Sequence, residues 1–180
     1  MAAKTLLTAD ELEQMPDDDS VQVELDEGEL ITMPPAGEDH GYVEVEIASV
    51  LRNFVKQHKL GRVYSGDTGF RLNDLTVRAP DVAFVRRERV ESLRGQGFAR
   101  GSPDLAVEIY SASQSFRQLM RKVRQYLAAG CQVVLVVSRE VQEIDVFNAD
   151  GSEHTLKGND ILEIPELLPG FSIGVGDLFE

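Results

Sequence analysis

The chain has 180 residues, of which 42% are hydrophobic and 27% are charged. These proportions are those of a globular domain and exclude a disordered chain, and no apolar run approaches the roughly 18 residues of a membrane span. The single cysteine excludes an internal disulfide and a cysteine-based metal cluster. The N-terminus turns acidic at once and lacks the apolar stretch of a secretion signal. We therefore expect one cytoplasmic domain over residues 1–180.

The charge is unevenly distributed along the chain. The net charge of −13, taken as a whole, argues against a nucleic-acid partner. Residues 52–124, however, hold 15 bases and 7 acids, whereas residues 1–51 hold 14 acids and one base, and residues 125–180 hold 10 acids and 2 bases. The basic middle segment indicates a surface that faces an anion. A solvated surface of mixed sign is the alternative.

Periodicity and turn residues predict three helices and a series of strands. A capping box at Thr8 and Glu11 begins the first helix, and Ser113 is the expected N-cap of the third. The helices are expected over residues 8–15, 39–58 and 114–129. The strands are expected over residues 21–25, 29–33, 62–64, 68–72, 77–85, 105–110, 133–137 and 144–148, with an Arg- and Gly-rich loop over residues 86–101. This order predicts an α/β or α+β domain in which a mixed sheet has a helix on each side.

Two carboxylates stand inside apolar strands. Asp81 follows Pro80 within the strand expected over residues 77–85, and Glu108 lies in the strand over residues 105–110. A carboxylate in a strand core is costly unless a metal, an ion pair or hydrogen bonds compensate it. Two of them on adjacent strands can converge on one cation, and oxygen ligands without cysteine favour Mg²⁺ or Mn²⁺. The alternative is that each faces solvent or pairs with an arginine.

Three further polar residues are candidates for the same chemistry. Lys122 lies at the edge of the apolar face of its helix, beside Tyr126, and could reach over the sheet towards Glu108; a surface lysine is the alternative. Glu24 alternates with Val23 and Leu25, which predicts that it points to solvent. His40 falls on the apolar face of the second helix, where a packing histidine is the more common role.

Several motifs, in this order and spacing, resemble the Uma2 family, a group of restriction-endonuclease-like proteins of bacteria. They are Val23-Glu24-Leu-Asp-Glu-Gly28-Glu-Leu30, Met33-Pro34-Pro35, His40, Val77-Arg-Ala-Pro80-Asp81-Val-Ala-Phe84, Pro103-Asp104-Leu-Ala-Val-Glu108-Ile-Tyr-Ser111-Ala-Ser113, Lys122, Tyr126, Ala129-Gly130 and Leu168-Pro169-Gly170-Phe171. The chain departs from the family pattern at Ala112, where a proline is frequent, and at Gln118, where an aspartate is common.

The resemblance implies the PD-(D/E)xK nuclease fold, a restriction-endonuclease-like mixed β-sheet flanked by helices. In that fold Asp81 and Glu108 would be the metal-binding acids, with the carbonyl of Ile109 as a further ligand. The resemblance assigns the catalytic lysine to Lys122, on the helix, because Tyr110 occupies the position two residues after Glu108. Glu24 would lie at the rim of the site, with His40 and Tyr126 as accessory residues.

The function expected from this resemblance is metal-dependent hydrolysis of phosphodiester bonds by an endonuclease that uses Mg or Mn. The rival hypothesis is a non-catalytic module that kept the fold and acts in binding or assembly. The observation that distinguishes these two hypotheses is whether Lys122 converges with the acids or faces away from them. The expected partners are nucleic acid, DNA rather than RNA, and a second copy of the chain in a homodimer. The expected phosphate contacts are Arg86, Arg87, Arg117, Arg121 and Arg124.

Overall fold

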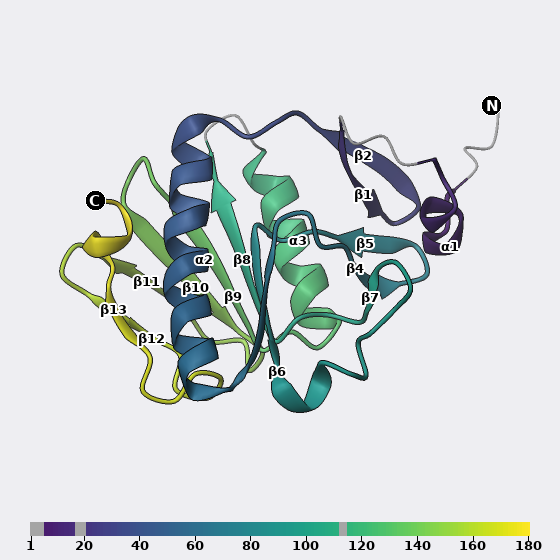
Figure 1. Ribbon diagram of the computed structural model, residues 1–180. Helices are drawn as coiled ribbons and strands as arrows, with labels where there is room; N and C mark the ends of the chain where they lie inside the picture. Colours follow the sequence, from purple (N-terminus) through teal and green to yellow (C-terminus); the bar gives the residue numbers. More distant parts are fainter. Residues whose placement is uncertain (1–5, 17–20, 112–114) are drawn as a thin grey trace.

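The computed structural model describes residues 6–16, 21–111 and 115–180. The helices are α1 (Ala9–Glu13), α2 (Glu38–His58) and α3 (Phe116–Ala128), with the 3-10 helices η1 (Arg87–Arg89) and η2 (Gly176–Leu178). The strands are β1 (Gln22–Asp26), β2 (Glu29–Met33), β3 (Gly61–Ser65), β4 (Phe70–Asn73), β5 (Thr76–Arg78), β6 (Val82–Arg86), β7 (Ala99–Arg100), β8 (Leu105–Tyr110), β9 (Val133–Ser138), β10 (Glu143–Asn148), β11 (Glu153–Lys157), β12 (Ile161–Glu163) and β13 (Ser172–Gly174). Figure 1 shows their arrangement.

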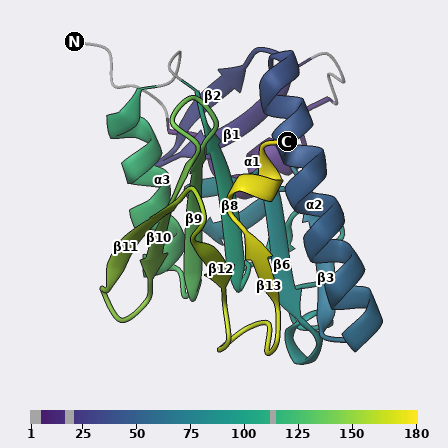
Figure 2. The same cartoon turned by 90° about the vertical axis from the view of Figure 1, so that its left-hand side faces the viewer.

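A six-stranded mixed sheet forms the centre of the molecule. Its strand order is β11-β10-β9-β8-β6-β3, with β8 and β9 parallel and the other neighbours antiparallel. Helix α2 packs on one face and α3 on the other (Figure 2). Along β8, Leu105, Val107 and Ile109 point into the cluster under α2, and Ala106 points into the cluster under α3. The expected mixed sheet with a helix on each side is confirmed.

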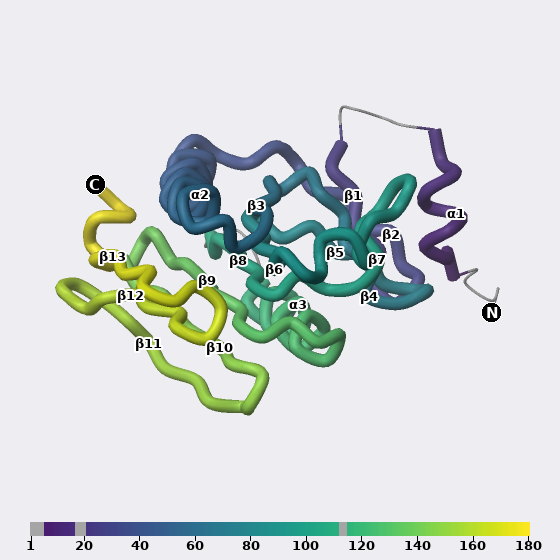
Figure 3. The backbone as a smooth tube through the Cα atoms, turned by 60° about the horizontal axis from the view of Figure 1, so that its bottom comes forward, coloured from purple at the N-terminus to yellow at the C-terminus, as the bar shows by residue number. Residues whose placement is uncertain are grey.

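A second sheet lies beside the first and carries α1 (Figure 3). Its order is β2-β1-β5-β4-β7. Leu25 of β1 and Val77 of β5 pack against Ala9 and Leu12 of α1 in a small apolar cluster. The expected capping box is present, because Thr8 accepts the Glu11 N–H and the Glu11 carboxylate accepts the Thr8 N–H at 2.8 Å.

The expectation of one continuous strand over residues 77–85 is wrong, because the structure divides this segment between the two sheets. β5 ends at Arg78 and β6 begins at Val82. Pro80 lies between them and has no backbone N–H to donate to a ladder. The break places Asp81 at the junction of the two sheets, immediately before β6.

The remaining differences from expectation are local. The segment expected as a loop over residues 86–101 contains η1 and the two-residue strand β7. The third helix begins at Phe116 in the described part of the chain, and Ala112 and Ser113 lie outside the described residues. Among the residues described, no helix combines the length and apolar character that crossing a membrane requires.

Candidate active site

Glu108 is a buried carboxylate on the central strand β8. Because side chains alternate along a strand, Glu108 faces α3, as Ala106 does. Two residues of α3, four apart and therefore on one face of the helix, donate to it: Lys122 Nζ lies 2.7 Å from Oε2, and Tyr126 Oη lies 2.8 Å from Oε1. Both carboxylate oxygens thus have a donor.

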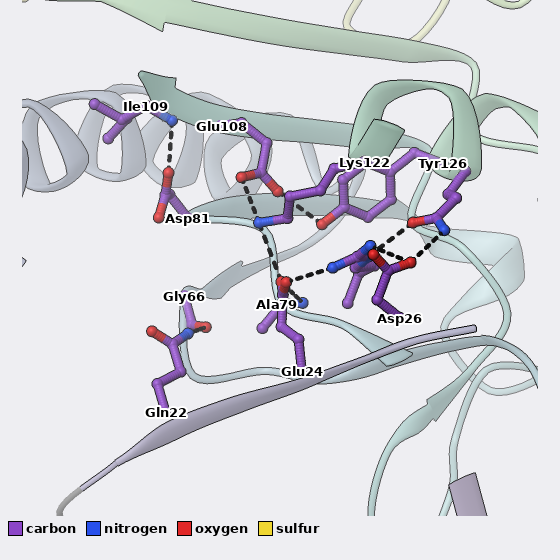
Figure 4. A network of polar contacts seen from close by, with 12 residues as sticks. Gln22, Glu24, Asp26, Gly66, Ala79, Asp81, Glu108, Ile109, Lys122 and Tyr126 are labelled. Carbon is purple, nitrogen blue, oxygen red and sulfur yellow. Dashed lines mark hydrogen bonds and ion pairs between the residues drawn. The ribbon is translucent and has the colours of Figure 1, made fainter. Parts of the chain in front are cut away.

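The same ammonium group binds a second carboxylate, from the other sheet. Lys122 Nζ lies 3.1 Å from Oε1 of Glu24, so the lysine bridges β8 and β1 (Figure 4). Oε1 of Glu24 also accepts the Ala79 N–H at 2.9 Å, and Oε2 accepts from Arg78 Nη1 at 2.8 Å. The expectation that Glu24 points to solvent is wrong, because α1 covers the Leu25 face of β1 while Arg78 and Lys122 cover the opposite face. Glu24 is 1% exposed.

Arg78 connects this cluster to the edge of α3. Its Nη2 lies 2.8 Å from Oδ1 of Asp26, and its Nε donates to Oε1 of Gln125 at 2.8 Å. Gln125 in turn donates to Asp26 at 2.8 Å. The arginine is 3% exposed, so three partners from β1 and α3 satisfy a buried guanidinium. These bonds fix α3 relative to β1 and hold Lys122 in its place.

The burial of these charges shifts their protonation equilibria. Burial raises the pKa of Glu108 to about 7; Lys122 opposes this shift, whereas Asp81 and Glu24 add to it. Burial disfavours the charged form of Lys122, but Glu108 and Glu24 outweigh it and raise the pKa of the lysine. Burial and the same two acids also raise the pKa of Tyr126. Lys122 and Tyr126 therefore keep their protons at neutral pH.

Asp81 lies across from Glu108 where β6 begins. Val82 pairs with Val107 in the antiparallel register, and Asp81 is the next residue towards the Glu108 end of β8. Oδ2 of Asp81 accepts the Ile109 N–H at 2.6 Å. The side chain is 20% exposed, whereas that of Glu108 is 3% exposed. Asp81 is therefore the acid of this pair that solvent reaches.

Helix α2 contributes two side chains to the same place. His40 Nε2 lies 3.1 Å from Oδ1 of Asp81. One ligand-type atom from each of His40, Glu44 and Asp81 lies within 4.8 Å of the other two. The hydrogen bond with Asp81 raises the pKa of His40, and burial together with repulsion from Asp81 raises that of Glu44. All three line a cavity of about 260 Å³.

The structure brings together the seven residues that the sequence placed in or near the site. They are Glu24, His40, Asp81, Glu108, Ile109, Lys122 and Tyr126. Sequence reasoning missed Glu44 and Arg78. The spacing of Glu44 four residues after His40 was a usable signal for the first. Nothing in the sequence identified Arg78, whose partners are distant along the chain.

The five arginines expected to contact phosphate lie in different surroundings. Arg86 lies at the other end of β6 from Asp81, and its backbone N–H and Nε donate to buried Asp104 at 2.8 and 2.9 Å. Arg86 thus binds Asp104 and does not face the site. Arg121 pairs with Asp26 at 3.1 Å and with Glu27 at 2.8 Å. The other three are exposed and form no ion pair with any residue described: Arg87, Arg117 and Arg124.

We expect Lys122→Met to lower the free energy of unfolding by about 3 kcal/mol at pH 8, because Glu24 and Glu108 would stay buried without their shared cation. Arg124→Met removes an exposed cation from the same helix and should change the free energy of unfolding by less than about 0.5 kcal/mol. Urea denaturation in EDTA measures both.

The deficit of Lys122→Met should shrink as the pH falls towards 7. Lys122 lowers the pKa of Glu108, so without the lysine this carboxyl is protonated at a higher pH than in the wild type, and the variant gains stability first. Equal deficits for the two methionine variants, or a deficit that grows at low pH, would contradict the buried lysine bridge.

Comparison with known proteins supports the same fold. None of the curated proteins searched matches the chain. Among solved structures, the crystal structure of "a putative nuclease belonging to DUF820 from Anabaena variabilis ATCC 29413" superimposes with a TM-score of 0.83 at 21% identity, covering 96% of this chain and 97% of that chain. At this identity the likeness shows the fold, and the expected restriction-endonuclease-like class is confirmed. A family model described as "Putative restriction endonuclease" matches residues 9–176. The chain therefore belongs to the Uma2 family.

Proposed function

We propose that the protein is a metal-dependent endonuclease that hydrolyses phosphodiester bonds in nucleic acid, with DNA rather than RNA as its substrate. The observation that carries the proposal is that Asp81, just before β6, converges with Glu108 of β8 and Lys122 of α3 beside an open cavity. The description of the family supports the same activity. The rival hypothesis, a non-catalytic module, is favoured if the lysine faces away from the acids. In this structure it contacts Glu108 at 2.7 Å.

The residues at the junction of the sheets fit a divalent cation. Asp81 is partly exposed in the cavity, and the carboxylates of Glu44 and Asp67 line the same space, so the donors are rich in oxygen. Such donors suit Mg²⁺ or Mn²⁺. Asp81 and Glu108 would hold the ion, with the Ile109 carbonyl beside them; Glu108 would use the lone pairs that Lys122 and Tyr126 leave free. When bound, the cation neutralises charge on the phosphate and lowers the pKa of a bound water.

The chain's own groups would position the substrate and stabilise charge. Lys122 keeps its proton, so it acts as a fixed positive charge near the phosphate rather than as a base. Glu24 and Glu108 fix the direction of its ammonium group from two sides. Tyr126 donates to Glu108 and keeps that carboxylate from rotating. Hydrolysis forms a bond between the water oxygen and phosphorus and breaks the bond to the leaving oxygen, which takes up the proton that the water loses.

Two cavities define a path for the substrate. The first is the cavity at Asp81, and the second, of about 290 Å³, is lined by Lys122 and Glu24. Met33 lines both cavities. The second cavity extends to Ser115, next to exposed Arg117 in the first turn of α3. We infer that a nucleic-acid strand follows this line. The part of the chain that the structure describes holds one such cluster, so we propose a homodimer for cutting both strands of a duplex.

We expect the wild-type protein to cleave plasmid or oligonucleotide DNA in millimolar Mn²⁺ or Mg²⁺ and to be inactive in EDTA. Asp81→Asn and Lys122→Met should each reduce cleavage by at least about 100-fold, since the first removes a ligand of the cation and the second removes the fixed positive charge near the phosphate. Gel assays on duplex DNA, single-stranded DNA and RNA measure this. Binding without cleavage on all three substrates would favour the non-catalytic module.

We expect millimolar Mn²⁺ to raise the melting temperature, because a ligand that binds only the folded state stabilises it by about 2.7 kcal/mol at 100 times its Kd. Asp81→Asn should lose this response, whereas Asp67→Asn, at the edge of the cavity, should keep most of it. Differential scanning calorimetry with and without EDTA measures the shift. A flat response of the wild type would contradict the cation site.

We expect duplex binding to weaken as the salt concentration rises. The double variant Arg117→Gln with Arg124→Gln should flatten the slope of log affinity against log salt by about 1 to 2, because each lost phosphate contact lowers that slope by about 0.9. The pair Arg62→Gln with Arg94→Gln makes the same change of charge around another cavity and should leave the slope unaltered. Fluorescence anisotropy at several salt concentrations measures both. Equal slopes for the two double variants would contradict a contact through α3.

A further inference from the structure

Helix α2 presents a histidine and a glutamate to Asp81. His40 and Glu44 are four residues apart, so they share one face of the helix. One ligand-type atom of each, with one of Asp81, lies within a common 4.8 Å. Two atoms bound to one Mg²⁺- or Mn²⁺-sized ion at about 2.1 Å are at most about 4.2 Å apart. A small inward movement would therefore let all three bind one ion.

The balance of charge separates this group from the lysine cluster. Three cations, Arg78, Arg121 and Lys122, pair with three acids, Glu24, Asp26 and Glu108, through contacts of 2.7 to 3.1 Å. On the cavity side, Asp81 and Glu44 have only the imidazole of His40 as a cationic partner among the residues described. The cavity side therefore has an excess of negative charge that a divalent cation would neutralise.

The loop between β3 and β4 holds the two carboxylates in place. A Cβ built on Gly66 would lie 3.4 Å from Oε1 of Glu44 and 3.5 Å from Cα of Asp81, so the glycine packs against both. The Gln22 side chain donates to the Gly66 carbonyl at 2.6 Å and ties this loop to β1. Figure 4 shows Gly66 and Gln22 below Asp81 in that view. The loop thus packs against two of the three residues that carry the ligand-type atoms.

We propose that His40 and Glu44 of α2 bind the divalent cation together with Asp81, which makes this a mixed imidazole–carboxylate site that prefers Mn²⁺ to Mg²⁺. The inference rests on the proposed function for the role of the ion and deepens it by naming the ligands and the metal preference. Imidazole nitrogen binds transition metals well, whereas Mg²⁺ favours oxygen ligands and retained waters. Glu108, whose two oxygens have Lys122 and Tyr126 as donors, would contribute less to metal affinity than α2 does.

The test is the Mn²⁺ complex of the full-length protein, studied by pulsed electron paramagnetic resonance and by calorimetric titration with Mn²⁺ and Mg²⁺. The wild type should show nitrogen coupling to Mn²⁺, which reports a bound imidazole, and should bind Mn²⁺ at least about tenfold more tightly than Mg²⁺. His40→Ala should abolish the coupling and weaken Mn²⁺ binding at least about tenfold. His58→Ala, at the other end of α2, should do neither.

A second pair of variants tests the glutamate. Glu44→Gln should weaken Mn²⁺ binding at least about tenfold, while Glu46→Gln, on a different face of the same helix, should leave it unchanged. Absence of nitrogen coupling in the wild type would overturn the inference without requiring any variant to fold. Mn²⁺ binding that depends on Asp81 and Glu108 but not on His40 would also overturn it, and the cleavage assays would still decide the proposed nuclease activity independently.

Discussion

The bridge from Glu108 through Lys122 to Glu24 is the interaction on which the rest of the site depends. It places one buried ammonium group at 2.7 and 3.1 Å from two carboxylates of different sheets. Neither acid would be stable there alone, because an unpaired buried charge costs several kcal/mol. The lysine therefore joins β8, β1 and α3 in one arrangement. It also leaves Asp81 outside the bridge, at the edge that solvent reaches.

The interruption between β5 and β6 at Pro80 gives Asp81 its position. If residues 77–85 formed one strand, Asp81 would lie in its middle with its neighbours on both sides hydrogen-bonded. Instead, the chain leaves one sheet after Arg78 and enters the other at Val82. Arg78, before Pro80, then forms an ion pair with Glu24, and Asp81, after Pro80, lines the cavity.

Patterns that are local in the sequence predicted the elements well. The spacing of apolar residues in α2 and α3, and the apolar run of β9, set the sheet and its two helices, and the position of Lys122 at the edge of its helix face indicated its reach towards Glu108. The orientation of Glu24 could not be predicted, because alternation distinguishes two faces of a strand without saying that both are covered. The pairing of Arg86 with Asp104 and of Arg78 with Glu24 joins residues 18 and 54 apart, beyond any local pattern.

We propose above all that the site carries a fixed lysine on one side of Asp81 and binds a divalent cation on the other. Anomalous diffraction from crystals soaked in Mn²⁺ tests this most directly, because it locates the ion without reference to activity. We expect a manganese peak beside the Asp81 carboxylate, on the side of His40 and Glu44, with Lys122 still between Glu24 and Glu108. No peak at Asp81, or a peak that displaces the lysine from its two carboxylates, would contradict it.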